Sequence, residues 1–244
     1  MVRYFDPFQS HVRVNLFPRR HNQRRRKLSS ISDQHNLADE SRTLYCLLDW
    51  LRLTHRILAL AKEDTVRTAI RETLEETAIP VGLAPVPDRA TALDVQRSLL
   101  AGASLGDPQL TLDPAALQPF ARWVPKFHAV RRFDTMFFVA ACPPGDWSPS
   151  VVEGECASAE WVAAAEVLDR ELRGEARLIF PTRRTLERLA QHSSIAAIRA
   201  DAASHPIEPI SPWVEDHGGK NFITIPDHLG FPVTREPLDG LWRG

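Results

Sequence analysis

The chain has 244 residues, of which 43% are hydrophobic and 25% are charged, and its formal net charge is −1. This composition is typical of a globular protein with one large domain, and it excludes a global electrostatic attraction to nucleic acid or membranes. No apolar run approaches the length of a membrane span or of a secretory signal. Cys46, Cys142 and Cys156 form no metal-ligand or disulfide pattern, which favours a reducing, cytoplasmic location.

Residues 1–60 form an atypical basic N-terminal region. Residues 1–30 hold eight Arg or Lys and one acid, a run typical either of a solvated arm or of a surface that binds phosphate backbones. The apolar patterns predict a short strand at 12–16 and a helix at 43–61. All 11 glycines of the chain lie at or after Gly82, so few positions in the N-terminal region suit tight turns.

Residues 61–244 combine helical and strand patterns in irregular alternation, which predicts an α/β (α+β) domain. Helices are expected at 64–77, 92–102, 163–172 and 181–191, strands at 121–125, 132–142, 156–162 and 221–226, and loops at 80–94 and 206–216. A short helix is also expected within 106–120. The strand at 132–142 lacks clear alternation and is rich in aromatic and branched residues, so we expect it to be buried on both faces.

The helix at 64–77 gathers three carboxylates. Its inner face is formed by Val66, Ala69, Ile70, Thr73 and Leu74, which can pack against a sheet. Glu72 and Glu76 are four residues apart and therefore share one flank of the helix, while Glu75 lies further round. Such a cluster either holds a hard divalent cation such as Mg²⁺, which prefers oxygen ligands, or is a solvated charged face.

Residues 71–79, with the sequence RETLEETAI, resemble the Nudix box, whose core reads R-E-apolar-x-E-E-x-G-apolar. Glu63 stands where the box has its first glutamate, and Ala78 replaces the glycine of the box. A β-carbon at that position strains any turn that needs a positive φ. The resemblance implies a mixed sheet sandwiched between helices and an enzyme that hydrolyses nucleoside diphosphates linked to another moiety.

The same resemblance implies roles for particular side chains. Mg²⁺ or Mn²⁺ would be held by Glu72, Glu75 and Glu76, and Arg71 would orient the first of these glutamates. A pyrophosphate is polyanionic, so attack by water needs a metal ion that neutralises charge and lowers the pKa of the water.

The second half of the chain extends the resemblance. Four segments are similar to the coenzyme A diphosphatase-like, peroxisomal-type branch of the family: 117–143, 153–168, 178–190 and 230–242. By this resemblance Glu155 is the candidate fourth carboxylate, as a metal ligand or as the general base. Arg131 and Arg132 are candidate substrate contacts, because the planar guanidinium binds phosphate oxygens bidentately, or else they begin a strand in solvent.

Other polar or aromatic residues in this half carry both a structural and a functional interpretation. Asp134 can cap the chain or pair with an arginine. Trp161 can belong to the core or stack on a ligand. Arg183 and Arg184, close to a helix start, are either surface residues or phosphate contacts, since helix N-termini attract phosphate.

Two functional hypotheses follow. The first is the metal-dependent hydrolase of nucleotide-linked diphosphates, with coenzyme A-like or dinucleotide substrates. The second is a catalytically impaired Nudix-like protein that binds nucleotide, or RNA through the basic residues 13–27, because the family normally has a Gly-Gly loop before the helix and the region upstream of Glu63 has no glycine. A shifted reading frame or start site would also explain the missing glycines.

Overall fold

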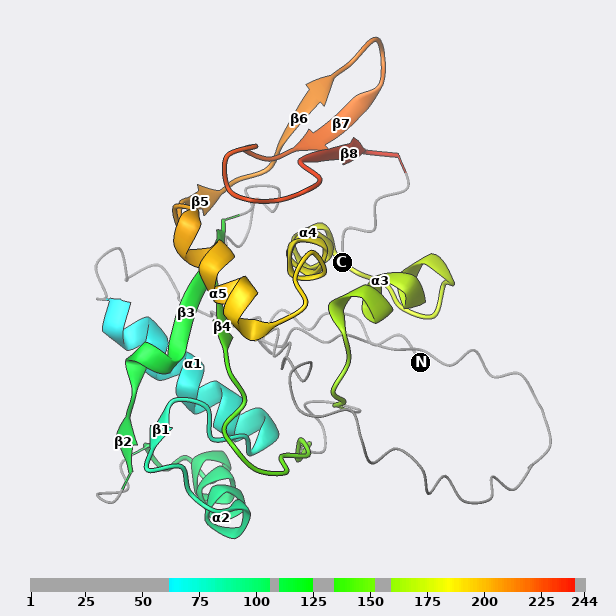
Figure 1. The fold of residues 1–244 in the computed structure, drawn as a ribbon. Helices are drawn as coiled ribbons and strands as arrows, with labels where there is room; N and C mark the ends of the chain where they lie inside the picture. Colours follow the sequence, from blue (N-terminus) through cyan, green and yellow to red (C-terminus); the bar gives the residue numbers. More distant parts are fainter. Residues whose placement is uncertain (1–61, 106–109, 125–133, 152–158, 240–244) are drawn as a thin grey trace, which may run out of the picture.

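The computed structural model describes residues 62–105, 110–124, 134–151 and 159–239 (Figure 1). The strand expected at 12–16 and the helix expected at 43–61 lie outside the described residues, as do Arg131, Arg132 and Glu155. In the described ranges, no helix combines the length and the apolar character that a membrane span requires.

The central sheet is mixed, as expected. Its strand order is β4 (Thr135–Ala140), β3 (Leu117–Trp123) and β5 (Pro209–Ile210). Strand β3 pairs with β4 in antiparallel register and with β5 in parallel register. The register of the β3–β4 pair shifts between Pro119 and Ala121, as at a β-bulge.

Helices cover both faces of this sheet, which confirms the predicted α/β fold and the predicted burial of the second strand. Along β4, Phe137 and Val139 belong to the core cluster formed with α4 (Phe180–Leu189) and α5 (Ile195–Ser204). Phe138 and Ala140 pack against the other cluster, which surrounds α1 (Lys62–Thr77). Successive side chains of a strand point to opposite faces, so the sheet separates the two cores (Figure 1).

The elements around α1 differ from the expectation at their ends. Helix α2 (Arg89–Leu100) begins earlier than predicted, because the Asp88 side chain accepts a hydrogen bond from the Thr91 amide at 2.8 Å and caps the helix. The segment expected to be a loop also contains β1 (Leu83–Ala84), which pairs with β2 (Thr111–Leu112). The expected short helix is the 3₁₀ turn η1 (Pro114–Ala116).

The C-terminal half contains α3 (Ala164–Leu172), α4 and α5. Pro181 lies in the first turn of α4, as the sequence predicts. Helix α5 was not expected; its start is capped by Ser194, whose hydroxyl accepts from the Ala197 amide at 3.2 Å. The strand expected at 156–162 is wrong for its described part, 159–162, which has no strand.

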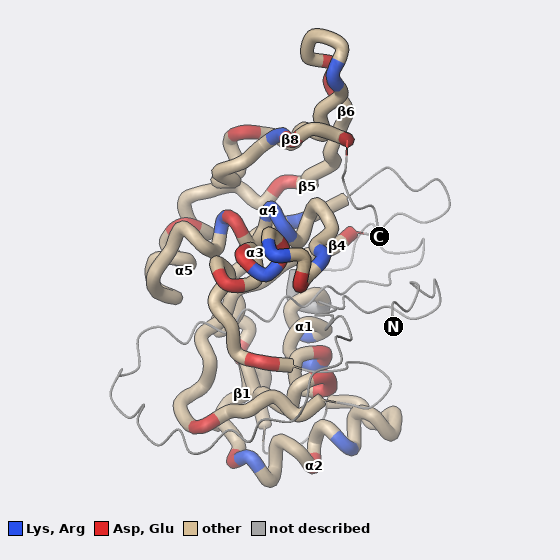
Figure 2. Tube along the Cα trace, turned by 90° about the vertical axis from the view of Figure 1, so that its right-hand side faces the viewer, with Lys and Arg blue, Asp and Glu red and all other residues tan. Residues whose placement is uncertain are grey.

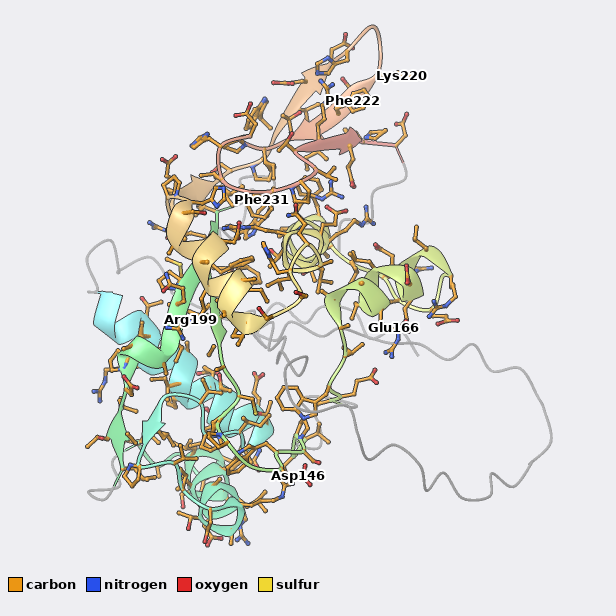
Figure 3. The ribbon with its side chains drawn as sticks, viewed as in Figure 1. Asp146, Glu166, Arg199, Lys220, Phe222 and Phe231 are labelled. Atoms are coloured by element: carbon orange, nitrogen blue, oxygen red, sulfur yellow. The ribbon has the colours of Figure 1, made fainter. Side chains whose placement is uncertain are left out.

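A second antiparallel sheet lies beyond α5 and projects from the body of the molecule (Figure 1). Its strands are β6 (Trp213–Asp216), β7 (Asn221–Thr224) and β8 (Arg235–Pro237). The loop expected at 206–216 is therefore wrong, since this segment contains β5 and β6. The ring of Phe231, labelled in Figure 3, meets Trp123 of β3 edge-on at 5.5 Å between ring centroids and ties the C-terminal segment to the core.

Candidate functional site

Helix α1 places all three glutamates in its last two turns. Its inner residues Ile70 and Leu74 are fully buried, so the helix is fixed by its apolar face. The C-terminal end of a helix carries a partial negative charge, and an acid there costs about 0.3–1 kcal/mol. Helix α1 has no basic residue in its last turn, so nothing cationic in that turn offsets this cost. A bound cation would reverse the sign of the interaction.

Arg71 brings two of the three glutamates together. Its guanidinium contacts the carboxylates of Glu72 and Glu75, and Figure 2 shows that α1 carries both acidic and basic residues. The Glu72 side chain is only 3% exposed, whereas that of Glu75 is 20% exposed. Burying a carboxylate as deeply as Glu72 is costly unless it has a charged partner, and Arg71 supplies one. The predicted pairing is present, while its catalytic role stays a prediction.

The donor chemistry of α1 fits a hard divalent cation, because carboxylate oxygens are the ligands that Mg²⁺ and Mn²⁺ prefer. Among the residues that the structure describes, however, no three His, Cys, Asp or Glu side chains form a group that could hold an ion. Two of the α1 glutamates share Arg71 instead, and Glu76 is partly exposed in the last turn. The described residues therefore include carboxylates of the kind that bind such an ion, but they do not bring three of them together into one metal site.

The C-terminal end of α1 receives hydrogen bonds from three different parts of the chain. Ala78, the residue in place of the box glycine, has φ +56° and is 1% exposed, which confirms the predicted strain at this position. A left-handed conformation costs an alanine about 1–2 kcal/mol. The last carbonyl groups accept hydrogen bonds from the Ala78 amide, the Gln96 side chain and the Ser150 amide. The helix end is therefore satisfied by α2 and by the chain around residue 150 as well as by its own turn.

Gln96 and Ser150 were not identified from the sequence. Gln96 lies on the same stripe of α2 as the buried Ala92 and Leu99. A glutamine inside an otherwise apolar stripe is the signal that could have pointed to it, because a buried amide must find hydrogen-bond partners. Ser150 follows a proline-rich loop and carries no such signal.

Asp134 and Trp161, for which the sequence left both a structural and a functional interpretation open, have structural contacts. The Asp134 carboxylate accepts from Arg122 Nε at 2.8 Å, and this hydrogen bond raises the pKa of Arg122. Trp161 packs against the α1 core cluster, and its indole N–H donates to the carbonyl of Trp147 at 2.6 Å. Both residues therefore bond to other parts of the chain.

The surface interpretation of Arg184 is wrong. Arg184 is 2% exposed and donates to Glu187 and Glu236, each at 2.7 Å, while Arg183 donates to Glu171 and Glu236. Burial lowers the pKa of Arg184 and raises the pKa of Glu187, whereas the hydrogen bond to Glu171 raises the pKa of Arg183. Both guanidinium groups thus bind carboxylates of the chain, which leaves the start of α4 poorly suited to phosphate.

Comparisons with known proteins place this geometry in context. No protein-family model matches the chain, and no curated protein does. Among solved structures, the chain is similar to a NUDIX hydrolase from Alicyclobacillus acidocaldarius, with 24% sequence identity, over 59% of this chain and 69% of that chain, at a TM-score of 0.44. With a TM-score below one half, this likeness establishes neither a family nor an activity.

Proposed function

We propose that the chain is a Nudix-type hydrolase that uses a divalent metal ion to cleave nucleoside diphosphates linked to another moiety. The observation that carries the proposal is the segment from Arg71 to Glu76. It matches the R-E-x-x-E-E order of the Nudix box and lies on a helix whose apolar face is buried. Glu75 and Glu76 stand in the last turn, where the helix end disfavours acids, which a functional cation explains better than a solvated surface does.

Each residue of this segment has a distinct part in the proposed reaction. Glu72, Glu75 and Glu76 would hold Mg²⁺ or Mn²⁺, which when bound neutralises the diphosphate and lowers the pKa of the attacking water. Arg71 fixes the direction of the buried Glu72 carboxylate through their ion pair.

Three residues outside the described ranges complete the proposal. Glu155 would act as a further metal ligand or as the general base that accepts the proton of the attacking water. Arg131 and Arg132 would bind the phosphate oxygens of the substrate. Coenzyme A-like and dinucleotide diphosphates are the candidate substrates, on the resemblance of the second half to that branch of the family.

The test is hydrolysis by the purified full chain with Mg²⁺ or Mn²⁺ and a panel of dinucleotides and coenzyme A, with products separated by chromatography. Glu76→Gln should lower kcat by at least about 100-fold with little change in the unfolding midpoint, because partners of metal ligands already cost 10–100-fold. Asp94→Asn on α2, which changes an exposed acid, is the matched control and should retain activity. Absence of product from every substrate would refute the proposal.

A second candidate function is nucleotide or RNA binding without hydrolysis. It is favoured by the pairing of both Glu72 and Glu75 with Arg71, which already neutralises part of the acidic cluster. This candidate predicts nucleic-acid binding that weakens steeply with salt and disappears when residues 1–30 are removed. The hydrolase proposal predicts that binding to RNA is negligible both with and without residues 1–30.

A further inference from the structure

Helix α4 shares a cluster of five charged side chains with α3 and β8, which lie next to it (Figure 1). Arg183, Arg184 and Glu187 belong to α4, whereas Glu171 comes from α3 and Glu236 from β8. These side chains are between 3% and 23% exposed. Three carboxylates thus meet two guanidinium groups in a largely buried place, so full ionisation leaves one carboxylate in excess.

The hydrogen bonds identify the carboxylate that is in excess. Arg183 donates to both oxygens of Glu171, at 2.7 and 2.8 Å, and to both oxygens of Glu236, at 2.8 and 3.1 Å. Arg184 Nη2 donates to Oε2 of Glu236 and to Oε1 of Glu187, each at 2.7 Å. The other oxygen of Glu187, Oε2, is buried and has no hydrogen-bond partner among the described residues. Glu187 is therefore the carboxylate whose charge the cluster compensates least.

A proton on Glu187 removes this excess charge. With Glu187 neutral, two guanidinium groups face the two carboxylates of Glu171 and Glu236, so the cluster has no net charge. Burial raises the pKa of Glu187, the charge of Arg184 lowers it, and the charge of Glu236 raises it. Arg183 of the same helix and Glu171 of α3 also act on it, in opposite directions. The charges that face Glu187 thus come from α3, from α4 and from β8.

Ionisation of Glu187 acts on the attachment of β8 through Glu236. The same nitrogen of Arg184 donates to Glu187 and to Glu236, so a charged Glu187 competes for it and also repels Glu236. The chain after β8 reports on this attachment, because the Leu238 amide donates to the Asn221 carbonyl of β7 at 2.8 Å. Opening of β8 would expose this amide to solvent.

We propose that Glu187 and Glu236 form a pH-sensitive clasp, which holds β8 against α4 while Glu187 is protonated and loosens as Glu187 ionises. The clasp goes beyond the proposed hydrolysis, since none of its residues belongs to the proposed metal site. Because the pKa of Glu187 is raised when β8 is docked, the docked state binds the proton more tightly than the open state. The stability of docking is therefore greatest at acid pH and falls as the pH rises towards the pKa of the docked state.

Hydrogen exchange of the Leu238 amide in the full chain measures the opening of β8. The rate is divided into that of an unstructured peptide at the same pH, which removes the intrinsic effect of pH and gives a protection factor. We expect the protection of Leu238 to fall at least about fivefold from about pH 5 to about pH 8. The Ser150 amide, which donates to the Thr77 carbonyl of α1 at 2.8 Å, is the internal control. Its protection should change less than about twofold, because the clasp does not involve α1.

Three variants assign the effect to the clasp. Glu187→Gln keeps the shape of the side chain but cannot ionise, so Leu238 should stay as protected at about pH 8 as at about pH 5. Glu236→Gln removes the charge that binds β8 to α4 and should lower the protection of Leu238 already at about pH 5. Glu175→Gln changes an exposed acid that pairs with Arg173, and it should keep the wild-type pH dependence.

The remaining outcomes overturn the clasp. Protection of Leu238 that is independent of pH in the wild-type chain does so without any variant. An equal fall of the Ser150 protection would show that the whole domain opens, not β8 alone. A wild-type pH dependence in Glu187→Gln, or wild-type protection in Glu236→Gln at about pH 5, would remove Glu187 or Glu236 from the device.

Discussion

Replacing Gly82 with alanine should loosen the packing beside the glutamate helix. Gly82 lies in the turn that follows α1 and has φ +70°. A β-carbon there would lie 2.8 Å from Cδ1 of Ile70 and 3.0 Å from Cδ1 of Leu117. Ile70, the residue before Arg71, is fully buried. Because protein cores are closely packed, its side chain has no empty space into which it can move.

The expected loss of stability combines three contributions. The left-handed conformation costs alanine about 1–2 kcal/mol. Forcing an extra methyl group into a packed core costs about 1–3 kcal/mol. The reduced freedom of the unfolded chain offsets about 0.4–1 kcal/mol. The net loss is about 1–4.5 kcal/mol, a large share of the about 5–15 kcal/mol that stabilises a typical domain.

Urea denaturation followed by tryptophan fluorescence measures this loss. At a slope of about 2 kcal/mol per molar urea, the midpoint should fall by about 0.5–2 M. Gly102→Ala is the matched control: Gly102 has φ +88°, but a β-carbon there would meet nothing within 4 Å. The control therefore carries the conformational cost without the clash, about 1 kcal/mol. Equal losses in the two variants would refute the packing argument.

Two further predictions concern the buried charges of α4. Arg188 is 1% exposed and its Nε donates to Asp201 at 2.7 Å, so Asp201→Asn should cost about 3–5 kcal/mol in urea denaturation; a loss below about 1 kcal/mol would contradict the role of this pair. Burial raises the pKa of Glu187 above its ordinary 4.5, so the folded state binds this proton more tightly than the unfolded state does. The wild-type chain then loses stability as the pH rises from the unfolded towards the folded pKa. The Glu187→Gln variant does not have this loss. The difference between the unfolding free energy of the variant and that of the wild type should therefore increase from acid to neutral pH. A difference independent of pH would contradict the assignment.

The sequence determined α1, the placement of its three glutamates and the strain at its end. Apolar residues at helical spacing bury one face wherever they occur in a fold, and Ile70 and Leu74 fix the rotation of the helix and hence the side on which the acids lie. The strain at Ala78 follows from local backbone sterics alone. The packing of 135–140 on both faces could also be predicted from the sequence, because its aromatic and branched residues leave no polar face.

The tertiary structure decided the features that depend on distant partners. The short strands β5 and β6 lie in a proline-rich segment that reads as a loop, and they form because β3 and β7 offer them unpaired backbone groups. Arg184 is buried because Glu236, far along the chain, returns to pair with it. Gln96 bonds Glu75 and Ser150 because the fold brings α1 and residues 147–150 to one side of α2. Local periodicity determines which face a helix buries, whereas the partner of a buried polar group depends on the path of the whole chain.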